Sequence, residues 1–250
     1  MPVTLVESAS SMLNKFCRPE RATLPFDTGS LPYSRAHVHL EHYSPSLFEQ
    51  AAIPMPASVA RSVPKRQADY LAGRLCARRA MEIWGYAGEP MAGHSGCPVW
   101  PRGLRGSISH SSRHAVALAL PATDCGGLGI DTELVASGRA SEALLRHAVL
   151  AEEHAALEVL STDMGRDAAI TVIFSAKESF YKAAFEQVGA YFGFEALALR
   201  RVRLDAKRME FSVTRTLAPQ LRKGKSISIG FEVTAMGSVL TYLALERVPA

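Results

Sequence analysis

The chain has 250 residues, of which 48% are hydrophobic and 21% charged, and its formal net charge is +4. This composition excludes disorder as the default, and the length allows one large domain or two modest ones. No run of about 18 apolar residues occurs, which predicts a soluble, cytoplasmic protein that does not enter the membrane. The cysteines lack Cys-x-x-Cys spacing, which favours isolated thiols over a disulfide frame or a zinc site. They are Cys17, Cys76, Cys97 and Cys125.

The first half of the chain combines strands, one helix and a loop. Patterning predicts a short strand over His37–His42 and an amphipathic helix over Lys65–Trp84. Gly85–Arg105 contains five glycines and three prolines, which is typical of a loop. An apolar strand is expected over Ala115–Leu120. The segment Pro121–Gly127 that follows it is rich in turn-forming residues and marks the clearest boundary in the chain.

The second half has a similar length and mixed content. A buried strand is predicted over Leu128–Asp131, and helices over Ser141–Leu160 and Asp167–Val188. Further strands are expected over Phe211–Thr216, Ser226–Val233 and Val239–Glu246. These elements predict an α+β protein of two similar lobes, 1–123 and 124–250, each a small antiparallel sheet packed with helices. A ligand cleft is expected between them.

Five basic side chains lie within one stretch of fifteen residues in the predicted first-half helix. They are Lys65, Arg66, Arg74, Arg78 and Arg79. Such a cluster suits an anionic ligand or an acidic partner. Nucleic acid binding would call for interleaved exposed aromatic residues, and only Tyr70 is present, so no nucleic acid partner is predicted.

A pair of carboxylates ends the strand in the segment Gly127–Glu133. Asp131 and Glu133 are spaced i, i+2, which places both on one side of a strand. Two carboxylates held so close favour a cation, and oxygen ligands suit Mg²⁺, or Mn²⁺ in its place. The alternative is a strand leaving the core with both carboxylates solvated.

The segment Phe174–Lys182 places Glu178 and Lys182 one helical turn apart, with Lys177 adjacent. A solvated Glu–Lys pair of this kind contributes only about 0.2–0.5 kcal/mol and is common on helix surfaces. Combined with the acidic strand, the helix supplies a third carboxylate for metal binding or proton abstraction and ammonium groups for phosphate oxygens. Together the two segments indicate a phosphoryl-type displacement.

The segment Gly106–Ser111 surrounds His110 with serines. A nucleophilic Ser–His pair is disfavoured, because adjacent residues seldom point at each other and no nucleophile elbow is present. We expect a phosphate-binding turn in which Ser109 and His110 donate hydrogen bonds, or alternatively a histidine at the edge of the core.

A second group of histidines comprises His37, His39 and His42. Metal binding there is disfavoured, since only Glu41 is available to complete a ligand set, and an exposed strand face is expected instead.

Five ordered segments carry a family resemblance. They are Lys65–Arg74, Pro98–Pro101, Gly106–Ser111, Gly129–Glu133 and Phe174–Lys182. In this order they resemble the 4′-phosphopantetheinyl transferases. Within that family they resemble the monomeric type found with siderophore synthetases, the enterobactin synthase component D branch, including bacterial versions that also serve fatty-acid synthesis.

The resemblance implies an enzyme of two pseudo-symmetric lobes that binds coenzyme A in its cleft. It implies transfer of the 4′-phosphopantetheine arm to a serine of an apo acyl or peptidyl carrier protein, with release of adenosine 3′,5′-bisphosphate. By the same resemblance, Asp131 and Glu133 hold Mg²⁺. Glu178 completes the metal shell or acts as the base, and both roles stay open.

The resemblance also assigns the phosphate contacts. Lys182, and more weakly Lys177, would bind phosphates. Ser109 and His110 would bind a phosphate that includes the 3′-phosphate. Arg66 and Arg74, eight residues apart and so on one helix face, would hold the 3′-phosphoadenosine end.

One departure from the family pattern precedes Pro98. Many relatives carry a basic residue there, whereas this chain has Gly96 and Cys97, and His94 is a candidate substitute. Two rival functions also fit the residues: a non-catalytic protein that binds coenzyme A or a carrier, and a metal-dependent phosphohydrolase. The sequence does not identify the carrier, and the loop Gly85–Arg105 and the helix Ser141–Leu160 are candidates for its docking surface.

Overall fold

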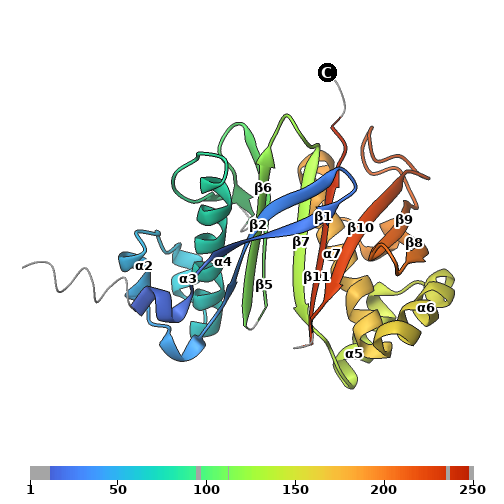
Figure 1. Cartoon of the computed structure of the whole chain (residues 1–250), viewed down its shortest axis with the longest axis horizontal. Coiled ribbons are helices and arrows are strands. Elements are labelled where there is room, and N and C mark those ends of the chain that lie inside the picture. The colour runs from blue at the N-terminus through green and yellow to red at the C-terminus, as the bar shows by residue number, and fades with distance from the viewer. Residues whose placement is uncertain (1–11, 94–96, 112, 235–236, 248–250) are drawn as a thin grey trace, which may run out of the picture. The chain divides into compact units, whose positions relative to one another are not determined.

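The computed structural model describes residues 12–93, 97–111, 113–234 and 237–247. The chain divides into two compact units, Met1–Pro121 and Ala122–Ala250, called unit 1 and unit 2 below. The division falls two residues before the boundary expected at residue 123. Both units combine antiparallel sheets with packed helices, so the predicted α+β class is confirmed (Figure 1).

Unit 1 contains a four-stranded antiparallel sheet in the order β1-β2-β6-β5. Its strands are β1 (Glu20–Phe26), β2 (Gly29–His37), β5 (Leu104–Ser111) and β6 (His114–Pro121). A small hairpin of β3 (Met91–Ala92) and β4 (Pro98–Val99) lies within the segment predicted as a loop. The apolar strand predicted over Ala115–Leu120 is present as β6, in which all six of those residues are buried.

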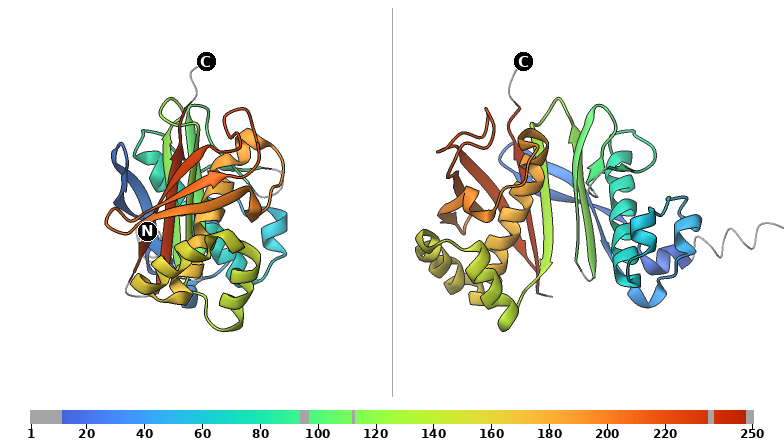
Figure 2. Two further views of the ribbon diagram at one scale, coloured as in Figure 1. Left: turned by 90° about the vertical axis from the view of Figure 1, so that its right-hand side faces the viewer. Right: turned by 180° about the vertical axis from the view of Figure 1, so that it is seen from behind.

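The helix of unit 1, α4 (Pro64–Glu82), lies along this sheet (Figure 2). Pro64 stands in its first turn, where its missing N–H costs nothing. Gly73 allows the helix to approach β5, since a Cβ there would lie 3.0 Å from Cγ2 of Ile108. The short elements η1 (Leu40–His42), α2 (Leu47–Gln50) and α3 (Ala57–Ala60) complete the unit.

Unit 2 contains a five-stranded antiparallel sheet in the order β7-β11-β10-β9-β8. Its strands are β7 (Gly127–Leu134), β8 (Leu197–Arg203), β9 (Arg208–Val213), β10 (Ser226–Val233) and β11 (Ser238–Leu245). Three of them match predicted strands closely, whereas β8 was not predicted. β8 escaped notice because Arg200, Arg201 and Arg203 interrupt its apolar start, Leu197–Leu199.

The long helix of unit 2, α7 (Arg166–Val188), packs directly on β7 (Figure 2). A Cβ at Gly127 would overlap the carbonyl oxygen of Ala183, and a Cβ at Gly129 would overlap that of Ser179. Four helix residues advance about 6 Å and two strand residues about 6.6 Å, so the two rows stay in register. The buried helix stripe consists of Thr171, Ser175, Ser179 and Ala183.

The single helix predicted over Ser141–Leu160 is wrong. The chain instead forms α5 (Arg139–Ala148), the 3-10 turn η3 (Ala151–Glu153) and α6 (His154–Met164). Val149 and Leu150 have extended backbone conformations that end α5. The Glu153 carboxylate then accepts a hydrogen bond from the Leu150 N–H at 2.7 Å, so this side chain fixes the break.

Two local predictions also fail. The strand expected over His37–His42 is absent, because β2 ends at His37 and η1 begins at Leu40. The turn expected over Gly106–Ser111 is a strand, since those residues belong to β5 and pair with β6 throughout. No helix among the described residues is both long and apolar enough to cross a bilayer.

Candidate functional site

The carboxylate of Asp131 lies buried where α7 crosses β7. Gly127, Gly129 and Asp131 alternate along the strand, so Asp131 faces the helix as the two glycines do. Its Oδ2 accepts a hydrogen bond from Ser175 Oγ at 2.7 Å, and its Oδ1 accepts one from Lys182 Nζ at 2.7 Å. The strand and the helix predicted from sequence to act together therefore meet at this carboxylate.

Glu133 follows on the same side of β7 and is half-buried. Glu178 is half-buried on α7, and no group in the described part of the chain donates a hydrogen bond to its carboxylate. Burial raises the pKa of Glu178, the charge of Asp131 raises it further, and Lys182 opposes both. A carboxylate so placed can accept a proton nearer to neutral pH than an exposed glutamate can.

The ammonium of Lys182 is held at the centre of this arrangement. Besides Asp131, it donates to the carbonyl oxygen of Ile130 at 3.2 Å. Lysine has three N–H donors, so one remains for another acceptor. About a quarter of the side chain is exposed, which makes that donor accessible.

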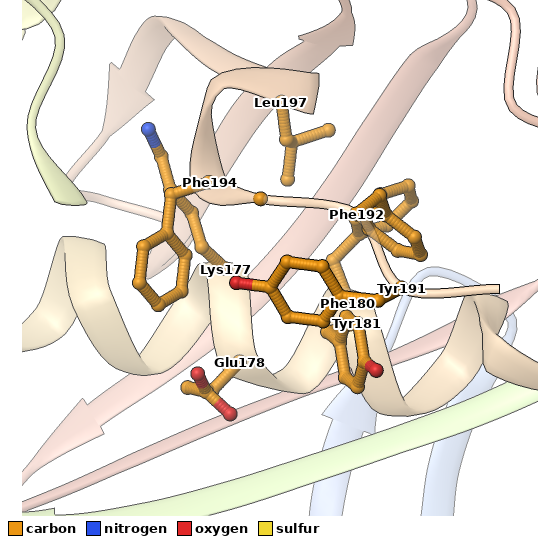
Figure 3. Close-up of a pocket in the computed structure, with 9 residues that line it drawn as sticks. Lys177, Glu178, Phe180, Tyr181, Tyr191, Phe192, Phe194 and Leu197 are labelled. Atoms are coloured by element: carbon orange, nitrogen blue, oxygen red, sulfur yellow. The ribbon is translucent and has the colours of Figure 1, made fainter. Parts of the chain in front are cut away.

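Lys177 occupies a different environment from Lys182. Its ammonium contacts Glu153 Oε2 at 2.9 Å, and the two side chains are 1% and 0% exposed. Figure 3 shows the Lys177 ammonium and the Glu178 carboxylate leaving α7 in opposite directions. Lys177 is buried and ion-paired, although it also lines a pocket together with Glu178. Its predicted phosphate contact therefore has less support than that of Lys182.

The chemistry of the three carboxylates suits Mg²⁺, because oxygen ligands are the ones it prefers. Asp131 raises the pKa of Glu178, so these two charges already repel each other, and a cation would relieve that repulsion. No three acidic, histidine or cysteine donors converge as a ligand set within the described residues. The carboxylates of Asp131, Glu133 and Glu178 thus have the right chemistry for the ion but are not arranged as a ligand set, and Lys182 neutralises Asp131.

A pocket of about 130 Å³ opens beside Glu178 (Figure 3). Its walls are mainly aromatic. The residues that line it are Lys177, Glu178, Phe180, Tyr181, Tyr191, Phe192, Gly193, Phe194 and Leu197. It accommodates a slender ligand with apolar groups.

In unit 1, Arg66, Arg74 and His110 line one pocket of about 110 Å³. Arg66 Nη1 lies 3.1 Å from His110 Nε2. Because a guanidinium only donates, Nε2 accepts here, which leaves the imidazole proton on Nδ1, 3.9 Å from Asp69 Oδ2. The structure thus brings together three of the four predicted phosphate ligands of unit 1.

Arg74 carries a buried donor that could serve an anion. The residue is 3% exposed, its guanidinium lies 4.9 Å from the Tyr70 ring centroid, and its buried Nη1 has no hydrogen-bond partner among the described residues. Leaving a buried charged donor unpaired costs about 1–3 kcal/mol or more. An anionic oxygen in the pocket would remove that cost.

Ser109 does not join the other three. Ile108 and His110 face α4, as their proximity to Gly73 shows, so Ser109 points to the opposite face of β5 and is buried there. Ser109 and His110 would therefore contact different groups. His94 and Gly96, relevant to the departure before Pro98, lie outside the described residues.

A fourth histidine, His114, lies beside the group of His37, His39 and His42, and the sequence did not indicate it. His114 on β6 pairs with His37 on β2, and the ring centroids lie 5.3 Å apart. Burial and neighbouring positive charge lower the pKa of both histidines. His37, His39 and His42 are exposed, as expected, although only His37 lies in a strand.

Other contributors were also missed. Asp69 and Tyr70 lie beside the predicted arginines on α4, and the Lys65–Asp69 spacing of i, i+4 was the available signal. Ser175, which binds Asp131, and Glu153, which binds Lys177, had no sequence signal, because only the tertiary fold brings them to their partners.

Comparisons with known proteins show the family. The profile of the 4′-phosphopantetheinyl transferase N-terminal domain matches residues 49–120, and that of the 4′-phosphopantetheinyl transferase superfamily matches residues 127–235. Enterobactin synthase component D of Escherichia coli O157:H7 is 34% identical over 166 residues, which span 65% of this chain and 78% of the relative. The chain belongs to the 4′-phosphopantetheinyl transferase superfamily.

Two further members of the superfamily are also similar. The 4′-phosphopantetheinyl transferase Svp of Streptomyces mobaraensis is 35% identical over 147 residues, 57% of this chain and 58% of the relative. The 4′-phosphopantetheinyl transferase Npt of Nocardia iowensis is 33% identical over 140 residues, 55% of this chain and 60% of the relative. The family predicted from five sequence segments is thereby confirmed.

Proposed function

We propose that this protein transfers 4′-phosphopantetheine from coenzyme A to a serine of an apo acyl or peptidyl carrier protein, releasing adenosine 3′,5′-bisphosphate. The observation that carries the proposal is the half-buried Glu178 carboxylate, with its raised pKa, beside the Asp131–Lys182 ion pair. It is a proton acceptor next to an ammonium that can bind phosphate oxygens, which is what a displacement at phosphorus needs.

Glu178 would remove the proton from the carrier serine, directly or through water. The serine oxygen forms a bond to the phosphorus that bears the pantetheine arm, and the bond from that phosphorus to the bridging pyrophosphate oxygen breaks. Lys182 would stabilise the charge that gathers on the phosphate oxygens, using its third N–H donor. The products are the holo carrier and adenosine 3′,5′-bisphosphate.

Asp131, Glu133 and Glu178 would hold Mg²⁺, with Mn²⁺ as an alternative. When bound, the ion supplies positive charge for the pyrophosphate oxygens. Lys182 would then divide its hydrogen bonds between Ile130 and the substrate. The test is a titration of the protein with Mg²⁺ followed by thermal unfolding, in which Mg²⁺ raises the Tm of the wild type and not that of Asp131→Asn. An equal rise in both would overturn the ligand assignment.

Unit 1 would bind the 3′-phosphoadenosine end through Arg66, Arg74 and His110, which line one pocket. The Nη1 of Arg74, which has no hydrogen-bond partner within the described part of the chain, supports this assignment. The predicted phosphate contact of Ser109 has less support, because its side chain is buried on the opposite face of β5. Unit 2, expected over 124–250, would carry the metal and catalytic residues. Lys177 would contribute to phosphate binding only if its ion pair with Glu153 opened.

The aromatic pocket beside Glu178 fits the pantetheine arm. The arm begins at the reacting phosphorus and carries a dimethyl group near it, and apolar walls would bury those methyl groups. Tyr181 and Tyr191 also line the pocket and would supply hydroxyl groups for hydrogen bonds to the amides of the arm.

The deciding experiment is mass spectrometry of an apo carrier protein incubated with coenzyme A, Mg²⁺ and this protein. A mass gain of one phosphopantetheine supports transfer. Hydrolysis of coenzyme A without a change in the carrier would favour a phosphohydrolase, and binding without reaction would favour a non-catalytic protein. Comparing siderophore, polyketide and fatty-acid carriers in the same assay identifies the carrier class served.

We further propose that the protein acts as a cytoplasmic monomer without a nucleic acid partner, which light scattering and nucleic acid titration would test.

A further inference from the structure

A buried ion pair lies on the side of α7 that faces away from the Glu178 carboxylate. Glu153 accepts three hydrogen bonds: Oε2 from Lys177 Nζ at 2.9 Å and from the Leu150 N–H at 2.7 Å, and Oε1 from the Leu199 N–H at 2.6 Å. Its side chain is fully buried. One carboxylate therefore joins three segments that are distant in sequence.

The three segments belong to different elements of unit 2. Lys177 directly precedes Glu178 on α7. Leu150 precedes η3 and α6. Leu199 lies in β8, the edge strand of the unit 2 sheet, where the pairing register shifts between Leu199 and Arg201. The N–H of an edge strand would otherwise lack a strand partner, and Glu153 supplies its acceptor.

Such a pair is a poor way to gain stability. Removing two charges from water costs several kcal/mol per ion, and apolar replacements of buried ion pairs are often neutral or stabilising. A buried charge pair does, however, impose one geometry, because displacing either partner leaves a charge unpaired. What this ion pair provides is therefore a fixed position of α7 rather than stability.

Position matters because Lys177 and Glu178 are adjacent on one helix. A helix with side chains has a radius of about 5–6 Å, so a rotation of about 10° moves a side-chain tip by about 1 Å. A displacement of that size in a catalytic group can cost about 10²-fold in rate. On its other side α7 contacts the glycines of β7, which permit close approach, and Ser175 and Lys182 bond to Asp131 there. The pair with Glu153 holds the opposite side of the helix.

We propose that Glu153 is a positioning residue for the transfer reaction: through Lys177 it fixes the rotation of α7 and thereby the place of the Glu178 carboxylate and the adjoining pocket wall. This inference rests on the proposed function. It concerns a residue in a 3-10 turn that touches neither the proposed metal ligands nor the pocket.

The test compares Glu153→Gln and Glu153→Asp with a destabilising control in the same unit. The amide of Gln cannot neutralise Lys177, and the shorter Asp retains the charge while losing reach, so Asp provides a folded variant if Gln does not fold. Val213→Ala on β9 is the control, because Val213 is buried in the same core and lies outside the site. All three variants should lower the Tm.

We expect the Glu153 variants to lower kcat for carrier modification at least 10-fold while the KM for coenzyme A changes less than threefold. Val213→Ala should retain kcat below its Tm. Crystal structures of the Glu153 variants should show the Glu178 carboxylate displaced by about 1 Å or more relative to the sheet. Unchanged kcat in folded Glu153 variants, or an equal loss in Val213→Ala, would overturn the proposal.

The crystallographic arm separates this inference from the proposed function. If the wild-type protein modifies no carrier, the proposed function fails, and a role for Glu153 in catalysis fails with it. A displaced Glu178 would then still establish that Glu153 fixes α7, whereas an undisplaced one would refute that as well.

Discussion

Both units pack a long helix closely against a sheet, but the glycines that permit this lie on the helix in one unit and on a strand in the other. In unit 1 the glycine lies on the helix, where Gly73 faces Ile108 and His110 of β5. In unit 2 the glycines lie on the strand, where Gly127 and Gly129 face the backbone of α7. A glycine on the helix spares the side chains of the sheet, so His110 remains beside the arginines of α4. Glycines on the strand let α7 approach until Lys182 reaches Asp131.

The difference in charge follows from this arrangement. Unit 1 gathers guanidinium groups around a pocket and leaves Arg74 Nη1 without a hydrogen-bond partner among the described residues. Unit 2 gathers carboxylates and raises the pKa of Glu178. The charges of unit 1 therefore suit an anion, and those of unit 2 suit a cation or a proton.

The largest effect is expected for Glu178→Gln, which removes a carboxylate from the unit 2 site. Removing the proton acceptor should lower carrier modification by about 10²–10⁴-fold, because general base catalysis contributes about that factor. The measurement is kcat from the mass shift of the carrier. The matched control, Glu158→Gln on α6, changes a side chain that is 69% exposed and should retain full activity. Near-normal turnover of Glu178→Gln would remove Glu178 from the mechanism.

A second test compares the glycines themselves. Gly129→Ala forces a Cβ into the carbonyl oxygen of Ser179 and should cost about 3 kcal/mol or more, lowering the Tm by about 6–12 °C. Gly73→Ala meets only a side-chain methyl at 3.0 Å and gains about 1 kcal/mol of helix propensity, so its Tm should change little. Thermal unfolding of both variants measures the difference. Equal losses would mean that the two units do not differ in this way.

A third test sharpens the assignment of unit 1 to the 3′-phosphate. Arg74→Met should raise the KM for coenzyme A by about 10–100-fold, since a hydrogen bond between charged groups is worth about 1.5–3 kcal/mol. The KM for 3′-dephospho-coenzyme A should stay unchanged, and Arg66→Ala should act in the same direction. Arg79→Met, also on α4 but paired with Glu82 at the surface, is the control. An equal rise for both substrates would place Arg74 elsewhere on the ligand.

The smallest effect concerns pH and the stability of unit 2. Folding raises the pKa of Glu178 above its ordinary value of 4.5. From about pH 4.5 upward the unfolded chain loses this proton first, so the folded state binds more protons and stability falls as pH rises through this window. Glu178→Gln does not titrate there. Its Tm in EDTA should equal that of the wild type near pH 4 and exceed it increasingly toward pH 7. A constant difference would contradict the raised pKa.

Much of the site could be predicted because its residues lie in local patterns. The i, i+2 spacing of Asp131 and Glu133 and the i, i+4 spacing of Glu178 and Lys182 are fixed by strand and helix geometry alone. The long helices and the strands with uninterrupted apolar runs were predictable for the same reason. The break after Ala148 was not, because a carboxylate that reaches back from Glu153 decides it.

The amino-acid sequence was enough to predict the family, through five segments that resemble its motifs, and the α+β class, through hydrophobic patterning. The spacing of the carboxylates and lysines likewise follows from strand and helix periodicity. The tertiary structure decided which lysine is accessible. Lys177 and Lys182 look equivalent in the sequence. In the structure Lys177 is buried against Glu153, whereas Lys182 lies beside Asp131 and is partly exposed. The physical reason is burial: contacts between segments dozens of residues apart set the local dielectric and the partners of a charge, and no local pattern encodes them.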